Sequence, residues 1–95
     1  SFQEMCLERY PCFRFASDAI EAGPAGMIAL NAANEVAVSA FLSKKISFVS
    51  IFQVINDIFQ QADFREVNDL NDIMQIDEQI RRRTHHLIDH AFTIS

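Results

Sequence analysis

Two groups of polar side chains have the types and the spacing for binding chemistry, and the first lies near the middle of the chain. Asn31, Asn34 and Glu35 follow one another at helical intervals, which places them on one face of a helix. They could hold a ligand or a second domain, or form a solvated or internally hydrogen-bonded stripe. Acid–base catalysis or a metal site would need a partner for the single carboxylate. Because buried polar groups need partners that a neighbouring domain can supply, we predict a domain contact.

The second group is a pair of histidines near the C-terminal end. His86 and His90 are four residues apart, a spacing at which two helical histidines can bind one metal ion. His85 and Asp89 point elsewhere on a helix, and the arginine run 81–83 would repel a cation. We therefore favour a solvated face near a helix C-terminus, where partly charged histidine is favourable.

The remaining sequence offers few reactive groups. Arg81, Arg82 and Arg83 follow Asp77 and Glu78 by about one turn, which predicts local ion pairs rather than a phosphate site. Glycine-rich phosphate loops, Cys-x-x-Cys pairs and paired carboxylates at a useful spacing are absent from the sequence. The two cysteines are interpreted as reduced thiols of a cytosol-like compartment. No catalytic, cofactor-binding or metal-binding residue is assigned, so these residues specify no reaction.

Composition restricts the class of protein and its partners. The chain has 95 residues, 49% of them hydrophobic, which fits one folded domain. The formal net charge of −5 argues against a nucleic acid or an anionic membrane surface as partner. The longest unbroken apolar stretch is short, because Asn and Glu residues interrupt it, so we expect no segment to cross a bilayer.

Helices must position the polar groups, because the sequence has only two glycines and two prolines. Residues 1–10 are interpreted as a linker. A helix should begin at Pro11 and end at Gly23-Pro24. The next helix, over residues 26–44, is apolar almost all round, which is typical of a central helix.

Capping residues mark the later helices. Ser50 and Gln53 form a capping pattern for a helix over residues 50–61, with Val49 and Val54 as a hydrophobic staple. Its predicted inward residues are Ile51, Val54, Ile55, Ile58 and Phe59. A loop over 63–68 leads to Asp69, which caps a short turn carrying Leu70, Ile73 and Met74.

Asp77 should cap the last helix. The inward residues of that helix are predicted to be Ile80, Thr84, Leu87, Ile88 and Ala91. The resulting prediction is an all-α fold over residues 11–95, a bundle of four main helices plus one short helical turn.

One stretch carries a family resemblance. Residues 30–38 (Leu-Asn-Ala-Ala-Asn-Glu-Val-Ala-Val), followed by Phe41-Leu42 and Ile46-Ser47-Phe48, resemble the C-terminal region of 1-deoxy-D-xylulose 5-phosphate reductoisomerase. Tyr10-Pro11-Cys12 upstream and Ile76-Asp77 downstream extend the resemblance over nearly the whole chain.

The resemblance implies a larger enzyme. In that family an N-terminal domain holds NADPH, a central domain holds Mg²⁺ or Mn²⁺ and the substrate, and a C-terminal helical bundle packs on the central domain. The homodimeric oxidoreductase makes 2-C-methyl-D-erythritol 4-phosphate for non-mevalonate isoprenoid biosynthesis, in the bacterial cytoplasm or the plastid stroma. Its reactive residues precede the matching region, so this chain alone is expected to be inactive. Asn31, Asn34 and Glu35 would dock the bundle on the catalytic domain.

A second interpretation comes from the nine phenylalanines. Large exposed apolar patches mark partner sites. The chain could therefore be a free-standing helical protein-interaction module with an exposed apolar groove.

Overall fold

Three α-helices pack together in the part of the chain that the structure describes. This computed structural model describes Ala19 and residues 21–61 and 66–92. The helices are α3 (Pro24–Leu42), α4 (Phe48–Gln61) and α5 (Leu70–Leu87), and α5 continues into a π-helical turn, η1 (Ile88–Phe92). These residues include no β-strand, which confirms an all-α fold for them.

The prediction of four main helices is tested only in the described part of the chain. Most of the helix expected from Pro11 lies outside the described residues, as do the linker over 1–10 and both cysteines, although Ala19 and Glu21 are helical. Three main helices can therefore be counted in the described part of the chain, and the separate short turn is not found there.

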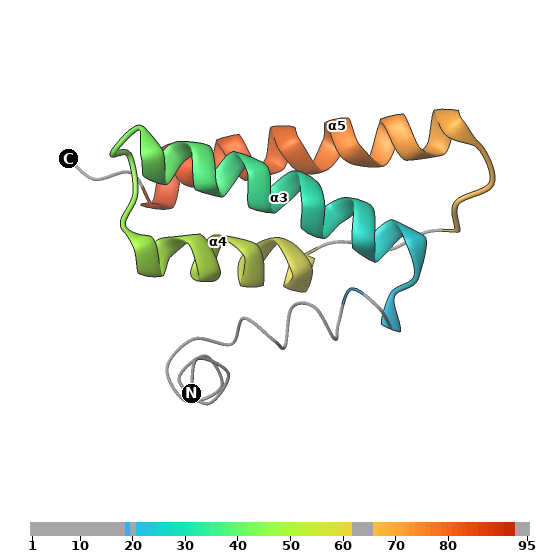
Figure 1. The fold of residues 1–95 in the computed structure, drawn as a ribbon, viewed down its shortest axis with the longest axis horizontal. Coiled ribbons are helices and arrows are strands. Elements are labelled where there is room, and N and C mark those ends of the chain that lie inside the picture. The colour runs from blue at the N-terminus through green and yellow to red at the C-terminus, as the bar shows by residue number, and fades with distance from the viewer. Residues whose placement is uncertain (1–18, 20, 62–65, 93–95) are drawn as a thin grey trace.

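The arrangement places α3 between the other two helices (Figure 1). Consecutive helices run antiparallel, so α3 and α5 point in the same direction. α3 contacts both α4 and α5, as expected for the central helix of a bundle.

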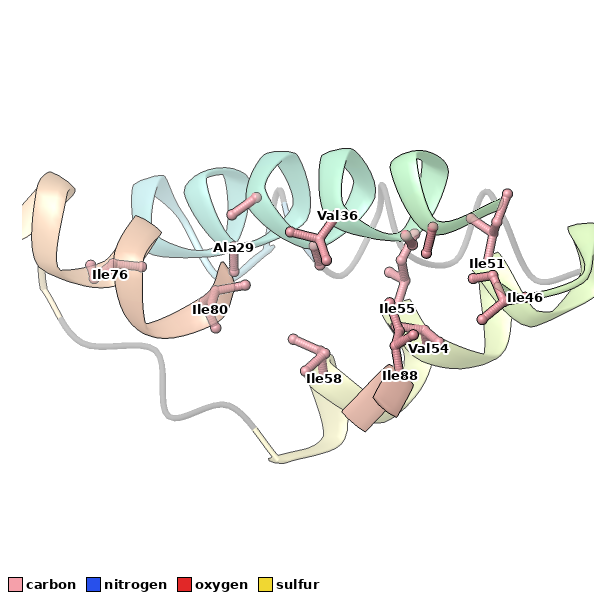
Figure 2. Close-up of a cluster of buried hydrophobic side chains, with 14 of the residues drawn as sticks. Ala29, Val36, Ile46, Ile51, Val54, Ile55, Ile58, Ile76, Ile80 and Ile88 are labelled. Carbon is pink, nitrogen blue, oxygen red and sulfur yellow. The ribbon is translucent and has the colours of Figure 1, made fainter. Parts of the chain in front are cut away.

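Small side chains allow these close contacts. The buried face of α3 consists of one valine, one glycine and six alanines: Ala25, Gly26, Ala29, Ala32, Ala33, Val36, Ala37 and Ala40. Short side chains let neighbouring helices approach, and the larger side chains of α4 and α5 then fill the interior. Figure 2 shows the isoleucines of these helices meeting beneath α3 at Ala29 and Val36.

α3 also has the length and composition of a membrane-spanning helix, although the sequence led us to expect none. It is 19 residues long and apolar on most sides. Its alanine face is buried against α4 and α5, which is the packing of a core helix. Length and apolarity alone therefore do not distinguish the two roles for this helix.

The predicted inward residues of α4 and of the last helix are largely confirmed. Ile51, Val54, Ile55 and Ile58 are buried and Phe59 is half-buried. In the last helix Ile80, Thr84 and Ile88 are buried and Leu87 is half-buried, whereas Ala91 is exposed in η1, so that residue was assigned wrongly. The buried hydroxyl of Thr84 donates a hydrogen bond of 2.6 Å to the Ile80 carbonyl, which allows a polar group in this core.

α5 corrects the predicted break between a short turn and the last helix. Asp69 is the N-cap, as predicted, and its carboxylate accepts a 2.9 Å hydrogen bond from the Asp72 N–H. Asp77 does not begin a new helix, because no glycine or proline interrupts α5 and its backbone continues unbroken. Leu70 and Met74 lie exposed on this helix.

The start of α4 lies earlier than the predicted Ser50 cap. The helix begins at Phe48, and the Ser47 hydroxyl accepts a 3.2 Å hydrogen bond from the Ser50 N–H. This shift moves the staple positions from Val49 and Val54 to Ile46 and Ile51, both of which are buried in the core. The capping pattern was therefore recognised three residues too late.

The α3–α4 connection has a left-handed residue that is not glycine. Lys44 has φ 63°, and its N–H and that of Lys45 donate to the carbonyls of Phe41 and Ala40 at 2.9 and 2.8 Å. This is the Schellman arrangement, in which glycine usually occupies the left-handed position. The left-handed conformation costs an L-residue about 1 kcal/mol.

We predict that Lys44→Gly raises the free energy of unfolding by about 0.5–1 kcal/mol, because glycine adopts this conformation without a Cβ clash. Urea unfolding followed by circular dichroism measures the change. Lys44→Ala is the matched control, since it removes the charge but keeps the Cβ. An equal gain for both variants would assign the effect to charge and contradict the prediction.

Gly26 marks the tightest contact at the start of α3. A Cβ at this position would lie 2.5 Å from the Ala19 carbonyl oxygen and 2.6 Å from the Ala22 Cβ. We predict that Gly26→Ala lowers the free energy of unfolding by about 1–3 kcal/mol, although alanine is the better helix former. Ser39→Ala on the exposed side of α3 is the control and should be neutral or slightly stabilising. Thermal unfolding of both variants tests this, and a stabilised Gly26→Ala would refute the close approach.

Candidate functional site

The polar stripe of α3 faces away from the buried alanines. Asn31, Asn34 and Glu35 are all exposed, so the structure brings the three predicted residues to one outer surface. Within the described part of the chain, neither asparagine makes a side-chain hydrogen bond. Both amides are thus available to a partner on this surface.

Glu35 reaches across to α5. Its carboxylate accepts a 2.5 Å hydrogen bond from Arg81 Nη2, and Arg81 Nε donates a second bond of 2.8 Å to Asp77. The Arg81 and Asp77 side chains are each 35% exposed and that of Glu35 is 56% exposed. The network therefore lies at the surface, where it sets the register between two parallel helices. The sequence did not identify Arg81 as the partner of Glu35, because the two residues are far apart along the chain.

Both carboxylates stabilise the protonated, charged form of Arg81. Hydrogen bonds to Asp77 and then to Glu35 raise the pKa of the Arg81 guanidinium above its ordinary value. A raised pKa of a cation means that its stabilising contribution is complete at neutral pH and is lost only in strong base. Arg81 therefore stays charged across the physiological range.

Exposed apolar side chains lie on the same two helices as the polar stripe and Arg81. On the outer side of α3, Met27 is 48% and Leu42 is 72% exposed. On α5, Leu70 is 70% and Met74 is 62% exposed, and they precede Asp77 and Arg81 at helical spacing. We name the combined surface the α3–α5 face; it consists of Met27, Asn31, Asn34, Glu35, Leu42, Leu70, Met74, Asp77 and Arg81.

Sequence reasoning missed the apolar members of the α3–α5 face. The signal was present for Met27, which precedes Asn31 by four residues, and for Leu42, which follows Glu35 by seven. Leu70 and Met74 were assigned to a short turn separate from the last helix, so the sequence analysis did not place them on one face with Asp77 and Arg81. A mixed surface of methionine, leucine, amides and arginine has the composition of a protein interface.

Aromatic side chains gather where the C-terminal end of α3 meets the start of α4. Phe41, Phe48 and Phe52 form two edge-to-face contacts with ring centroids 5.8 and 5.3 Å apart. Phe48 is 51% exposed and Phe41 is 36% exposed. Part of the phenylalanine excess is therefore at the surface, as the alternative interpretation requires.

The arginine run forms the local ion pairs that its sequence predicted. Arg81 pairs with Asp77, and Arg82 pairs with Glu78 at 2.5 Å. His86 and His90 are both exposed, with ring centroids 4.1 Å apart. No cluster of three or more potential metal-binding side chains occurs among the residues that the structure describes.

We predict a small coupling free energy, about 0.2–1 kcal/mol, between Glu35 and Arg81, because the pair is partly exposed. A double-mutant cycle of Glu35→Ala and Arg81→Ala, measured by urea unfolding, gives this value. The coupling should decrease at high salt. Glu35 with Arg82 is the matched control and should show no coupling, since Arg82 pairs with Glu78. Equal couplings for both pairs would disprove the specific bridge.

Comparisons with known proteins agree with one another. The family described as "DXP reductoisomerase C-terminal domain" matches residues 1–83 of the chain. A 1-deoxy-D-xylulose 5-phosphate reductoisomerase of Tolumonas auensis is 44% identical over 88 residues, which are 93% of this chain and 22% of that protein. The Buchnera aphidicola protein of the same name is 42% identical over 85% of this chain and 20% of its own length.

A relative from a different bacterium gives a similar result. The Lysinibacillus sphaericus protein, also named 1-deoxy-D-xylulose 5-phosphate reductoisomerase, is 43% identical over 85% of this chain and 21% of its own length. The chain thus spans about a fifth of the length of the curated relatives it matches.

Proposed function

Since the chain belongs to the DXP reductoisomerase C-terminal domain family, we propose that it is the helical bundle of a complete reductoisomerase. The family match over residues 1–83 carries this proposal, and identities of 42–44% to named reductoisomerases support it. The whole enzyme would convert 1-deoxy-D-xylulose 5-phosphate to 2-C-methyl-D-erythritol 4-phosphate, using NADPH as reductant.

The role of the bundle itself would be mechanical. A stiff element that packs on a catalytic domain holds that domain in a productive geometry. The alanine-based core gives the bundle this stiffness, because tightly packed interiors deform little. NADPH and Mg²⁺ or Mn²⁺ would bind to the rest of the enzyme, and the 95-residue chain alone would be inactive.

We propose that Asn31, Asn34 and Glu35 contact the catalytic domain. The two amides are exposed without side-chain partners in the described part of the chain, and exposed apolar side chains lie on both sides of them. Such a surface can supply hydrogen bonds at its centre and apolar contacts around it. Arg81 would fix the Glu35 carboxylate for this contact.

The wider setting follows from the same family. The enzyme would be a homodimer in the cytoplasm of a bacterium, since the relatives named above are bacterial, or in the plastid stroma. The net charge of −5 supports a protein partner over a nucleic acid or an anionic membrane.

The alternative function is a free-standing helical protein-interaction module. The exposed aromatic corner of Phe41 and Phe48 favours it, because such rings often mark partner sites. The two functions use different surfaces, so substitutions can separate them.

We predict that Asn34→Arg in the complete enzyme weakens docking of the bundle, because a long charged side chain would enter the centre of the contact. NADPH oxidation in the presence of substrate should fall at least about ten-fold, and limited proteolysis should release the bundle sooner. The 95-residue chain alone should bind no NADPH at micromolar concentration.

Gln79→Arg on the exposed side of α5 is the matched control and should keep the parental activity. Equal activity of both variants would place the docking surface elsewhere. Micromolar NADPH binding by the chain alone would contradict the proposal that the rest of the enzyme, and not the bundle, binds NADPH.

A further inference from the structure

His86 and His90 lie side by side at the junction of α5 and η1. Both side chains are exposed, and their ring centroids are 4.1 Å apart with the planes tilted by 51°. In an α-helix, residues four apart are offset by about 40° around the axis. Here the four residues cross from α5 into the π-helical turn η1.

The spacing of the two rings suits a shared metal ion. Two imidazoles that bind one tetrahedral Zn²⁺ at about 2.0 Å hold their ring centroids roughly 5 Å apart. The observed 4.1 Å is about 1 Å shorter than this separation, so the two exposed rings must turn apart to bind one ion. Rotation of two exposed rings is enough to direct one nitrogen of each at the same ion.

The charge argument against a cation is weaker in the folded chain than in the sequence. Arg81 is paired with Glu35 and Asp77, and Arg82 is paired with Glu78. Within the described residues, these ion pairs leave Arg83 as the uncompensated member of the run.

We propose that His86 and His90 form a two-histidine chelate for a divalent transition metal ion of the Zn²⁺, Ni²⁺ or Cu²⁺ class. Imidazole prefers these ions, whereas Mg²⁺ and Mn²⁺ prefer oxygen ligands. Water completes the coordination. The bound ion joins the last turn of α5 to η1. The pair lies beyond residues 1–83, so the site is a property of this chain and not of the matched family region.

Isothermal titration of the untagged 95-residue chain with Zn²⁺ and Ni²⁺ tests the site. The expected result is one ion per chain, with affinity reduced at least about ten-fold in both His86→Ala and His90→Ala, because each variant loses the chelate. His85→Ala is the matched control; His85 lies beside Ser39 and Lys45 on another side of the helix, so its removal should leave the affinity unchanged. Mg²⁺ should produce no binding.

Electron paramagnetic resonance of the Cu²⁺ complex provides a second measurement. In the parent chain and in His85→Ala, the Cu²⁺ electron spin should couple to two imidazole nitrogens. In His86→Ala and His90→Ala it should couple to fewer than two. Circular dichroism checks that each variant is folded, and His86→Gln and His90→Gln replace any alanine variant that is not. The proposal is overturned if the parent chain binds no metal ion. It is also overturned if the His86 and His90 variants bind the ion as well as the parent, or if His85→Ala loses binding to the same extent as they do.

Discussion

The close packing of α4 and α5 against the alanine face of α3 is the interaction on which the rest of the structure depends. Six alanines and Gly26 let the helix axes approach, and branched side chains from the flanking helices fill the remaining space. Such packing tolerates little change in volume, because protein interiors are as dense as organic crystals. The position of Gly26 against the Ala19 carbonyl shows that this constraint extends to the very start of the helix.

This packing also determines which side chains remain outside. With one side of α3 buried, its polar stripe and the apolar residues beside it form an outer surface next to α5. The bridge from Glu35 to Arg81 connects the two helices there. Because exposed ion pairs contribute at most about 1 kcal/mol, the bridge sets orientation while the apolar core supplies the stability.

The α3–α5 face and the junction of α5 and η1 differ in what they offer chemically. The α3–α5 face has the mixed character of a contact surface, which suits a domain that supports a catalytic neighbour. The junction of α5 and η1 instead presents two imidazoles from one continuous helix. A supporting domain can thus carry a site of its own, because a rigid helix fixes the spacing of side chains without help from the rest of an enzyme.

The sequence by itself determined the helical class, the inward residues of α4, the Asp69 cap and the family, because periodicity, capping and a specific run of residues are local properties. It placed the Ser47 cap at Ser50 and divided α5 at Asp77, since serine and aspartate can either cap a helix or lie within it, and only the continuing backbone decides between these roles. The tertiary structure alone decided that Glu35 meets Arg81, that Leu70 and Met74 are exposed, and that the tilted rings of His86 and His90 are in contact. These features depend on how helices pack and where a π-turn begins, and a local pattern does not encode distances between segments that are remote along the chain.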